Sequence, residues 1–181
     1  MRFTSLSPDG LIALEPALFK DDRGWFFESF RKDLFDQAVG TKVDFVQSNH
    51  CRSYKNVLRG LHYQVQHPQG KLVRVVHGEV FDVTVDIRRS SPTFGQWIGT
   101  VLSAENQKQL WIPAGFAHGY LTLSDTADFL YKTTAYWSPS LERCIRYDDS
   151  DIGIAWPTTE DLILSAKDRT GLALVDAEVF D

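Results

Sequence analysis

The stretch that decides the fold is Asn56–Val76, NVLRGLHYQVQHPQGKLVRVV. Its first part carries Arg59 and His62 after an apolar pair, its middle is a polar turn, and a β-branched run begins at Lys71. This order predicts two strands joined by a short loop. A histidine with a cation on either side is unusual in a segment that otherwise has the composition of a core. We therefore expect His62 to act as a base, with Arg59 and Lys71 stabilising negative charge on a bound molecule.

The rest of the chain repeats this pattern of short apolar runs and turn residues. Besides the strands of Asn56–Val76, the predicted strands are Trp25–Phe30, Val43–Gln47, Glu79–Ile87, Gln96–Leu102, Gln109–Ile112, Ala117–Leu123 and Asp128–Trp137. One helix is predicted at Arg31–Val39, where apolar residues at helical spacing precede a glycine. Many short strands with almost no helix are typical of a sandwich or barrel. We expect one all-β domain over residues 1–181, with the tail from Ser150 wrapped on the sheet.

Two strands place polar side chains on a definite face. In Glu79–Ile87 the apolar residues alternate with Asp82, Thr84 and Asp86, and the sequence leaves open whether these aspartates line a cavity or face water. In Asp128–Trp137 the same alternation puts Tyr131 and Trp137 on one face, about 20 Å apart. That spacing suits an extended ligand, with chemistry at one end and ring stacking at the other.

The composition excludes several classes of protein. The chain has 181 residues, of which 43% are hydrophobic and 24% charged. This length is enough to bury a core, and this composition argues against disorder. Its net charge of -5 argues against nucleic-acid binding, and no segment approaches the roughly 18 apolar residues of a membrane span. The N-terminus lacks the apolar core of a secretory signal, and Cys51 and Cys144 follow no metal or disulfide spacing. We expect a cytoplasmic protein with no nucleic-acid or membrane partner.

Two histidines stand at positions similar to those of the two cupin motifs. His62 follows Gly60 and Leu61, and His118 leaves a corner formed by Pro113 and Gly115. A cupin metal site commonly has His-x-His with a later Glu and His, but Gln64 stands where the second histidine would be. Two imidazoles are too few for a transition-metal site, so we expect no catalytic metal. Whether His118 contacts a ligand or only structures its corner stays open.

Several motifs together resemble those of the dTDP-4-dehydrorhamnose 3,5-epimerase family. They occur in the same order over roughly Leu14–Asp168, and they are FVQSNH (45–50), VLRGLH (57–62), QGKLVR (69–74), GEVFDV (78–83), SPTFGQW (91–97), LWIPAGFAHG (110–119), FLYK (129–132) and SAKD (165–168). The resemblance implies a cupin-type jelly-roll β-sandwich with a few short helices, usually a homodimer. It also implies that neither a catalytic metal nor another cofactor is needed.

The resemblance further implies a reaction. Members of this family epimerise carbons 3 and 5 of dTDP-4-dehydro-6-deoxy-D-glucose to give dTDP-4-dehydro-L-rhamnose, a step of dTDP-L-rhamnose biosynthesis that supplies cell-envelope glycans such as lipopolysaccharide. The keto group between the two carbons acidifies their protons, so a base can remove each one and an acid can return it on the opposite face. The chemistry needs a base, an acid and positive charge near the enolate oxygen.

The matched motifs assign roles residue by residue. His62 corresponds to the general base, Asp168 to the carboxylate that pairs with it, Tyr131 to the general acid and Lys71 to the group that stabilises the enolate oxygen. The positions matching substrate contacts are Arg23, Glu28, Gln47, Ser48, Asn49, Arg59, Lys71, His118, Trp137, Glu142 and Lys167. Trp137 stands where the family has a tyrosine that stacks on thymine, and an indole can stack there as well.

Two alternatives remain open. One is an enzyme that epimerises only one carbon of a related dTDP-4-keto-sugar, which would keep the same base and acid. The other is a non-catalytic cupin that binds nucleotide sugars. The presence of His62, Tyr131, Lys71 and Asp168 together argues against this second alternative, because a binding protein needs neither an acid nor a base.

Overall fold

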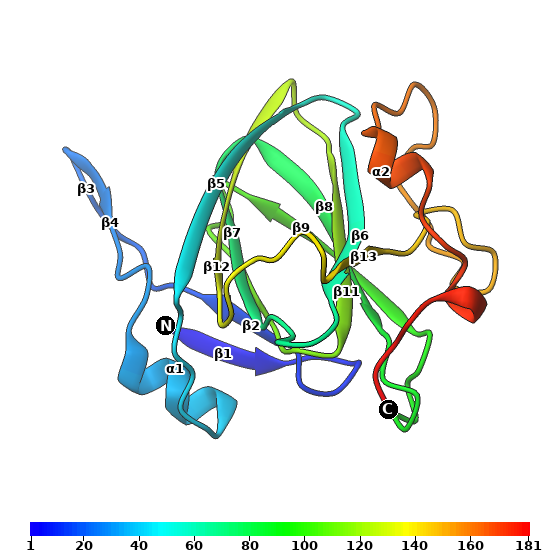
Figure 1. Cartoon of the computed structure of the whole chain (residues 1–181). Helices are drawn as coiled ribbons and strands as arrows, with labels where there is room; N and C mark the ends of the chain where they lie inside the picture. The colour runs from blue at the N-terminus through cyan, green and yellow to red at the C-terminus, as the bar shows by residue number, and fades with distance from the viewer.

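A computed structural model describes all residues 1–181 and shows two antiparallel β-sheets that face each other (Figure 1). The first sheet has six strands in the order β1-β2-β10-β7-β12-β5. The second sheet has five strands in the order β13-β6-β11-β8-β9. Strands distant in the sequence are therefore neighbours in both sheets, and the all-β sandwich expected from the sequence is confirmed.

The element bounds are as follows. The first sheet contains β1 (Arg2–Ser5), β2 (Ile12–Glu15), β5 (Gln47–Tyr54), β7 (Lys71–His77), β10 (Gln109–Ile112) and β12 (Thr126–Thr133). The second contains β6 (Leu58–Gln64), β8 (Glu79–Asp86), β9 (Trp97–Ser103), β11 (Phe116–Thr122) and β13 (Glu142–Cys144). A hairpin of β3 (Phe19–Asp21) and β4 (Gly24–Phe26) projects away from both sheets (Figure 1). The helices are α1 (Lys32–Val39), α2 (Ala166–Arg169) and a 3-10 turn (Leu174–Asp176), and none has the length and apolar character needed to cross a membrane.

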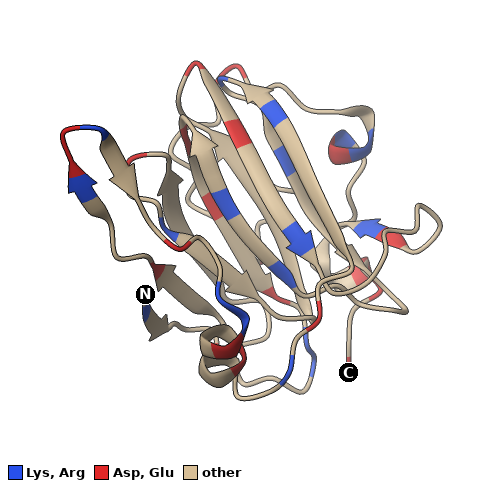
Figure 2. Ribbon diagram, turned by 90° about the vertical axis from the view of Figure 1, so that its left-hand side faces the viewer, with Lys and Arg blue, Asp and Glu red and all other residues tan.

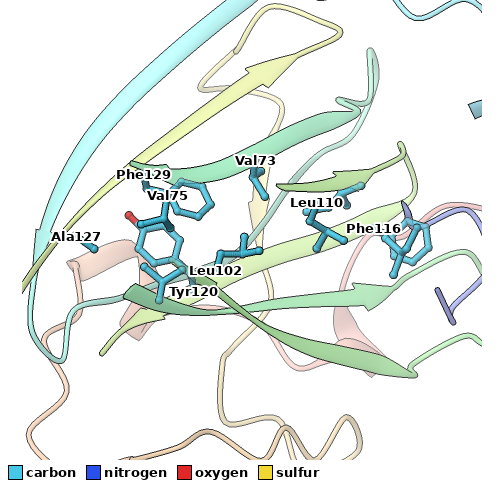
Figure 3. Close-up of a cluster of buried hydrophobic side chains, with 11 residues drawn as sticks. Val73, Val75, Leu102, Leu110, Phe116, Tyr120, Ala127 and Phe129 are labelled. Carbon is cyan, nitrogen blue, oxygen red and sulfur yellow. The ribbon is translucent and has the colours of Figure 1, made fainter. Parts of the chain in front are cut away.

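The space between the sheets is filled at its centre by an apolar cluster (Figure 3). Val73 and Val75 of β7 point into it, as the period of two along a strand requires. The rings of Tyr120 and Phe129 stack inside it with centroids 4.3 Å apart and planes inclined by 13°. These two rings also border the cavity described below, so the core forms one of its walls.

Both faces of β8 are covered. Its apolar side chains Val83 and Val85 pack against the C-terminal tail, in a cluster that includes Ile152, Leu174 and Ala177. The tail therefore wraps the second sheet, as the sequence predicted. The polar face of β8 is buried as well, because Asp82 and Asp86 have no exposed surface. The question that the sequence left open is thereby answered: neither aspartate faces water.

The strands β6 and β11 approach each other closely beside the site. A Cβ atom added to Gly60 would lie 2.6 Å from the Cα of Gly119, and Gly60 has a φ of +123°. A side chain at this position would therefore clash with backbone and strain its own residue. In the pairing of β6 with β11, His62 lies directly opposite His118.

The predicted strand Asp128–Trp137 is wrong at its C-terminal end, because β12 stops at Thr133. Both of its neighbours have their first residues there: Thr133 pairs with Gln47 of β5 and with Lys71 of β7. Beyond this point the chain has no strand to pair with. Trp137 is thus carried by a loop and not by the strand of Tyr131.

Two other predicted strands differ from the structure, while the helix is confirmed. The strand expected at Val43–Gln47 begins only at Gln47, and the segment Trp25–Phe30 is a strand only as far as Phe26. The apolar residues that suggested strands pack instead around α1, in a cluster that contains Phe30, Phe35, Val43, Phe45 and Trp111. These apolar side chains are buried around α1 and do not form one face of a strand.

Candidate active site

A cavity of about 350 Å³ lies between the two sheets. Its walls come from β5, β7 and β12 of the first sheet and from β6, β11 and β13 of the second. Most of the predicted site residues line it: Gln47, Asn49, Arg59, His62, Lys71, His118, Tyr131, Trp137, Glu142 and Lys167. Residues that are far apart in the sequence thus converge on one space.

His62 on β6 is held by Asp168, which lies in α2. The distance between Nε2 of His62 and Oδ1 of Asp168 is 2.6 Å. Asp168 does not line the cavity, because it is buried behind the imidazole and only 3% exposed. The hydroxyl of Ser165 donates to its Oδ2 at 2.6 Å, and the backbone N–H of Gly60 donates to its Oδ1 at 3.3 Å. With Nε2 engaged by Asp168, Nδ1 is the ring nitrogen left to exchange a proton with a ligand.

The environment sets the charge of this pair. Burial lowers the pKa of His62 below its ordinary value, and the hydrogen bond to Asp168 only partly opposes this effect. Burial raises the pKa of Asp168, but the hydrogen bonds from His62 and Ser165 outweigh it and bring the pKa to about 2. At neutral pH the carboxylate is therefore ionised and the imidazole neutral. This is the state that a general base requires.

Lys71 lies beside His62 at the start of β7. Its Nζ donates a hydrogen bond to the backbone carbonyl of His62 at 3.3 Å. The side chain is buried, and this burial lowers the pKa of Lys71 to about 8. Most of the amine is still protonated at pH 7, so a positive charge lies in a poorly solvated wall of the cavity. A cation in such a place can stabilise negative charge that develops on a bound molecule.

Tyr131 stands on the other sheet. It belongs to β12, whereas His62 belongs to β6, so the two groups reach the cavity from opposite walls. Burial raises the pKa of Tyr131, which keeps the phenol protonated at neutral pH. A neutral base and a protonated acid thus flank the same space.

His118 makes a second pair with an aspartate. Its Nε2 lies 2.8 Å from Oδ2 of Asp82, and both residues are buried. The imidazole also stacks on Phe129, with ring centroids 6.0 Å apart. The other carboxylate oxygen of Asp82 has no hydrogen-bond partner in the protein, and neither does the hydroxyl of Thr84. His118 is therefore both a cavity residue and an anchored part of the sheet.

The mouth of the cavity is partly ordered by polar contacts. The backbone N–H of Trp137 donates to Oε1 of Gln47 at 3.0 Å, which fixes the loop that carries the half-exposed indole. Nζ of Lys167 lies 2.8 Å from Oε2 of Glu142. Arg59 donates from Nε to the hydroxyl of Ser53 at 3.0 Å. Cations and an exposed ring thus frame the entrance.

Three predicted contact residues do not line this cavity. Ser48 points to the opposite face of β5, where it borders a separate cavity of about 220 Å³ beside Arg74 and Lys132. Arg23 lies at the tip of the β3–β4 hairpin, in an exposed ion pair with Asp21, and charges of both signs mark this tip in Figure 2. Glu28 follows the hairpin and is also outside the cavity lining.

Sequence reasoning missed several lining residues: Cys51, Gln69, Gly119, Tyr120 and Phe129. A signal existed for three of them, because Cys51 continues the alternation of Gln47 and Asn49, Tyr120 that of His118, and Phe129 that of Tyr131. Sequence reasoning also weighed metal ligands from His62 and His118 alone. In the structure Cys144 and Asp168 approach His62, and one potential ligand atom of each lies within 4.8 Å of the others.

The fold and the cavity together define a cupin-type jelly-roll enzyme in which Gln64 stands in place of the second histidine of a His-x-His motif. The model of the dTDP-4-dehydrorhamnose 3,5-epimerase family matches residues 5–176. The chain belongs to this family, and the resemblance seen in its motifs is confirmed.

Curated relatives share most of the sequence. The dTDP-4-dehydrorhamnose 3,5-epimerase of Pseudomonas aeruginosa is 57% identical over 99% of both chains. That of Salmonella typhimurium is 61% identical over 94% of this chain and 93% of its own length.

Solved structures share the fold. The dTDP-6-deoxy-D-glucose-3,5-epimerase of Legionella pneumophila, in complex with dTDP-4-keto-L-rhamnose, has a TM-score of 0.95 and 50% identity over 98% of this chain and 94% of that one. A 3'-monoepimerase of Streptomyces bikiniensis in complex with dTDP-quinovose has a TM-score of 0.90 and 35% identity, over 94% of this chain and 87% of its own. Enzymes that differ in the number of carbons they invert thus share this architecture.

Proposed function

We propose that the protein inverts carbons 3 and 5 of dTDP-4-dehydro-6-deoxy-D-glucose and so forms dTDP-4-dehydro-L-rhamnose for dTDP-L-rhamnose biosynthesis. One observation carries the proposal: His62, paired with Asp168 at 2.6 Å, and the protonated Tyr131 enter one cavity from opposite sheets. Inversion needs a base on one side of the sugar ring and an acid on the other. The family to which the chain belongs supplies the substrate class.

The proposed reaction moves one proton off each carbon and one proton onto it. Nδ1 of His62 takes the proton next to the keto group, and the electrons of the broken C–H bond move onto the keto oxygen to give an enolate. The ammonium of Lys71 stabilises this oxygen. Tyr131 then donates its phenolic proton to the same carbon from the opposite face. Solvent reprotonates the phenolate and deprotonates the imidazolium, so the balance closes without an oxidant or reductant.

The remaining lining residues suit the nucleotide part of the substrate. Arg59 and Lys167 provide positive charge for the diphosphate, and the exposed indole of Trp137 provides a surface for the thymine ring. We assign contacts with the sugar or its diphosphate to the polar lining residues Gln47, Asn49, His118 and Glu142. Ser48 has no place in this assignment, since it lies on the other face of its strand.

A homodimer is the second part of the proposal. The β3–β4 hairpin carries Arg23 away from the cavity of its own chain and exposes Phe19, Trp25 and Phe26 by 65%, 58% and 67%. Exposed aromatic clusters of this kind mark interaction surfaces. A second copy that received the hairpin would cover these rings and bring Arg23 and Glu28 to a substrate. Phe26→Glu should then weaken the dimer in light scattering, whereas an unchanged mass would remove the hairpin from the interface.

We also propose that residues 1–181 act as one domain in the cytoplasm. The tail packs on the same sheet that carries His62, so site and tail share one core. Both cysteines are free thiols, as a reducing compartment keeps them.

The second candidate is an enzyme that inverts one carbon only. It is favoured by a specific observation, the close structural similarity to the 3'-monoepimerase of Streptomyces bikiniensis. Such an enzyme would use the same base and acid and would differ in how the ring is held.

Proton NMR in deuterated water separates these candidates. The purified protein is incubated with dTDP-4-dehydro-6-deoxy-D-glucose, and deuterium incorporation is followed at each carbon. Exchange at carbons 3 and 5 with formation of the L-rhamno product is the expected result. Exchange at one carbon would establish the single-site enzyme. Binding without any exchange would refute both and leave a nucleotide-sugar-binding protein.

A further inference from the structure

Cys144 is a thiol beside His62 that the proposed reaction does not use. It lies on β13 and pairs in register with His62 on β6, so the two side chains share one face of the sheet. Asp168 approaches the same point from α2. One ligand atom of each of the three residues lies within 4.8 Å of the others. The proposed reaction uses His62 and Asp168 but gives Cys144 no task.

The three donors form a recognisable ligand set. A sulfur, an imidazole nitrogen and a carboxylate oxygen are the ligands that Zn²⁺ takes in proteins. Thiolate favours such borderline-soft cations over Mg²⁺ and Ca²⁺. A thiolate and a carboxylate together also match the charge of a divalent cation. The hydrogen bonds that Asp168 receives from Gly60 and Ser165 would orient its carboxylate as metal-binding carboxylates are oriented elsewhere.

We propose that His62, Cys144 and Asp168 form a reversible binding site for a thiophilic divalent cation of the Zn²⁺ class, and that the bound cation inhibits the enzyme. The inhibitory part rests on the proposed function, because it requires His62 to be the base. The cation would take the place of the proton shared by His62 and Asp168 and would remove the imidazole from proton transfer. A small effector ion would thus act on the catalytic base itself.

The geometry requires only local adjustment. Nε2 and Oδ1 are 2.6 Å apart, whereas two ligands on a tetrahedral zinc ion with bonds of about 2.05 Å lie about 3.3 Å from each other. The small helix α2 carries Asp168, and a shift of under 1 Å there would make room for the ion between Nε2 and Oδ1. The sulfur of Cys144 lies within 4.8 Å of both atoms and would approach the ion by rotation of the thiol. Substrate or water would fill the fourth position. The nearby ammonium of Lys167 opposes a cation, but Glu142 offsets it at 2.8 Å.

Cys144 would bind a cation as the thiolate, so cation binding would release the thiol proton to solvent. A chelator that competes for the cation would remove it again.

Cobalt(II) tests the site without reference to activity. A cobalt–thiolate bond gives a strong sulfur-to-metal charge-transfer absorption in the near ultraviolet, so the full-length protein is titrated with Co²⁺ and this band is recorded. We expect the band in the wild type and in Cys51→Ser, the matched control for the other cysteine, and its loss in Cys144→Ser and Cys144→Ala. A wild type without the band, or a band retained in both Cys144 variants, would overturn the site. Thermal unfolding of each variant verifies that it is folded.

Zinc inhibition tests the consequence. Zn²⁺ should abolish turnover of the wild type, a chelator should restore it, and Cys144→Ser should need at least about tenfold more Zn²⁺ for half-inhibition. Equal sensitivity of wild type and Cys144→Ser would refute the inhibitory role. A cobalt band in a protein that turns over no substrate would leave the site standing and refute the proposed function, so the two failures are distinguishable.

Discussion

Two histidine–aspartate pairs border the same cavity, and they are built in different ways. His118 and Asp82 stand on neighbouring strands of one sheet, 2.8 Å apart, with side chains 8% and 0% exposed. His62 stands on that same sheet, but Asp168 reaches it from α2 in the C-terminal tail, 2.6 Å away. The side chain of His62 is 22% exposed. One pair is fixed by the strand ladder, and the other depends on how the tail docks.

The hydrogen bonds of the two carboxylates differ as well. Both oxygens of Asp168 accept hydrogen bonds, whereas Oδ1 of Asp82 has no partner in the protein. A fully bonded carboxylate keeps its charge and its position, while a buried oxygen without a partner costs free energy. The same two residue types therefore form the proposed base with its orienting group in one place and an anchored wall residue in the other.

Replacing each histidine gives the largest contrast. His62→Asn should lower kcat by about 10⁴-fold, the upper range for loss of a general base. His118→Asn should lower kcat/KM by about tenfold, the effect of one hydrogen bond worth roughly 1.4 kcal/mol. Steady-state kinetics on both variants measure these losses relative to the wild type, and thermal unfolding verifies that each variant is folded. Similar losses in both would show that the two pairs are not functionally distinct.

Lys71 lies beside the first pair, with its Nζ hydrogen-bonded to the backbone carbonyl of His62. It also interacts with the second pair, because burial lowers the pKa of Lys71 and the charge of Asp82 is among the effects that raise it. Lys71→Met should lower kcat by about 10²- to 10³-fold, as loss of one group that stabilises an oxyanion does. The same change should raise the free energy of unfolding at pH 7 by about 3 kcal/mol, since a pKa of about 8 in place of 10.5 measures the penalty for burying the charge.

The pH dependence provides the control for this stability change. Below pH 8 both the folded and the unfolded wild type hold the proton, and the folded state bears the full penalty. Between pH 8 and 10.5 the unfolded state binds more protons, so the wild type gains stability as the pH rises. The advantage of Lys71→Met should therefore shrink over this window in denaturant unfolding experiments. An advantage that stays constant up to pH 10.5 would contradict the assigned pKa.

The two aspartates give the next contrast. Asp168→Asn should lower kcat by about 10²-fold, because an amide neither stabilises the imidazolium nor fixes the tautomer. Asp82→Asn should act mainly on stability. The depressed pKa of Asp168 contributes stability that is present above its unfolded value of 3.8 and is lost as the pH falls through about 2. The unfolding free energies of wild type and Asp168→Asn should therefore converge between pH 5 and 2, and parallel curves would argue against this pKa.

The first pair was predicted because the family resemblance assigns His62 and Asp168 to two matched motifs, although the two residues are 106 positions apart. The segment around His62 has strand periodicity and a turn before Lys71, and Ser165–Asp168 is a recognisable motif. The second pair was not predicted. Alternation in β8 showed that Asp82 and Val83 face opposite sides, but which side lies inside depends on the tail that covers the valines. Long-range packing of this kind leaves no trace in the period of a single strand.

The same reason explains the errors. Beyond Thr133 the alternation of Tyr131 continues to Trp137 in the sequence, but a strand ends where its neighbours end, and those neighbours come from elsewhere in the chain. Cys144 was missed for a related reason, because its position beside His62 follows from the pairing of β13 with β6. Residue types and local spacing indicated the chemistry, whereas the pairing of distant strands determined which groups touch.

Trp137 gives the smallest predicted effect on kcat and serves as a baseline for both pairs. It lies at the mouth of the cavity with 52% of its surface exposed, and stacking on a base is worth about 1–3 kcal/mol by alanine substitution. Trp137→Ala should therefore raise KM by roughly 5- to 150-fold while kcat stays within about twofold, since stacking stabilises substrate and transition state alike.

Trp137→Tyr should restore most of the affinity. The pH profile of kcat should not move in either variant, because neither histidine pair is touched. A loss in kcat larger than the rise in KM would show that the ring positions the sugar and not the thymine, and it would bring Trp137 into the same functional unit as His62.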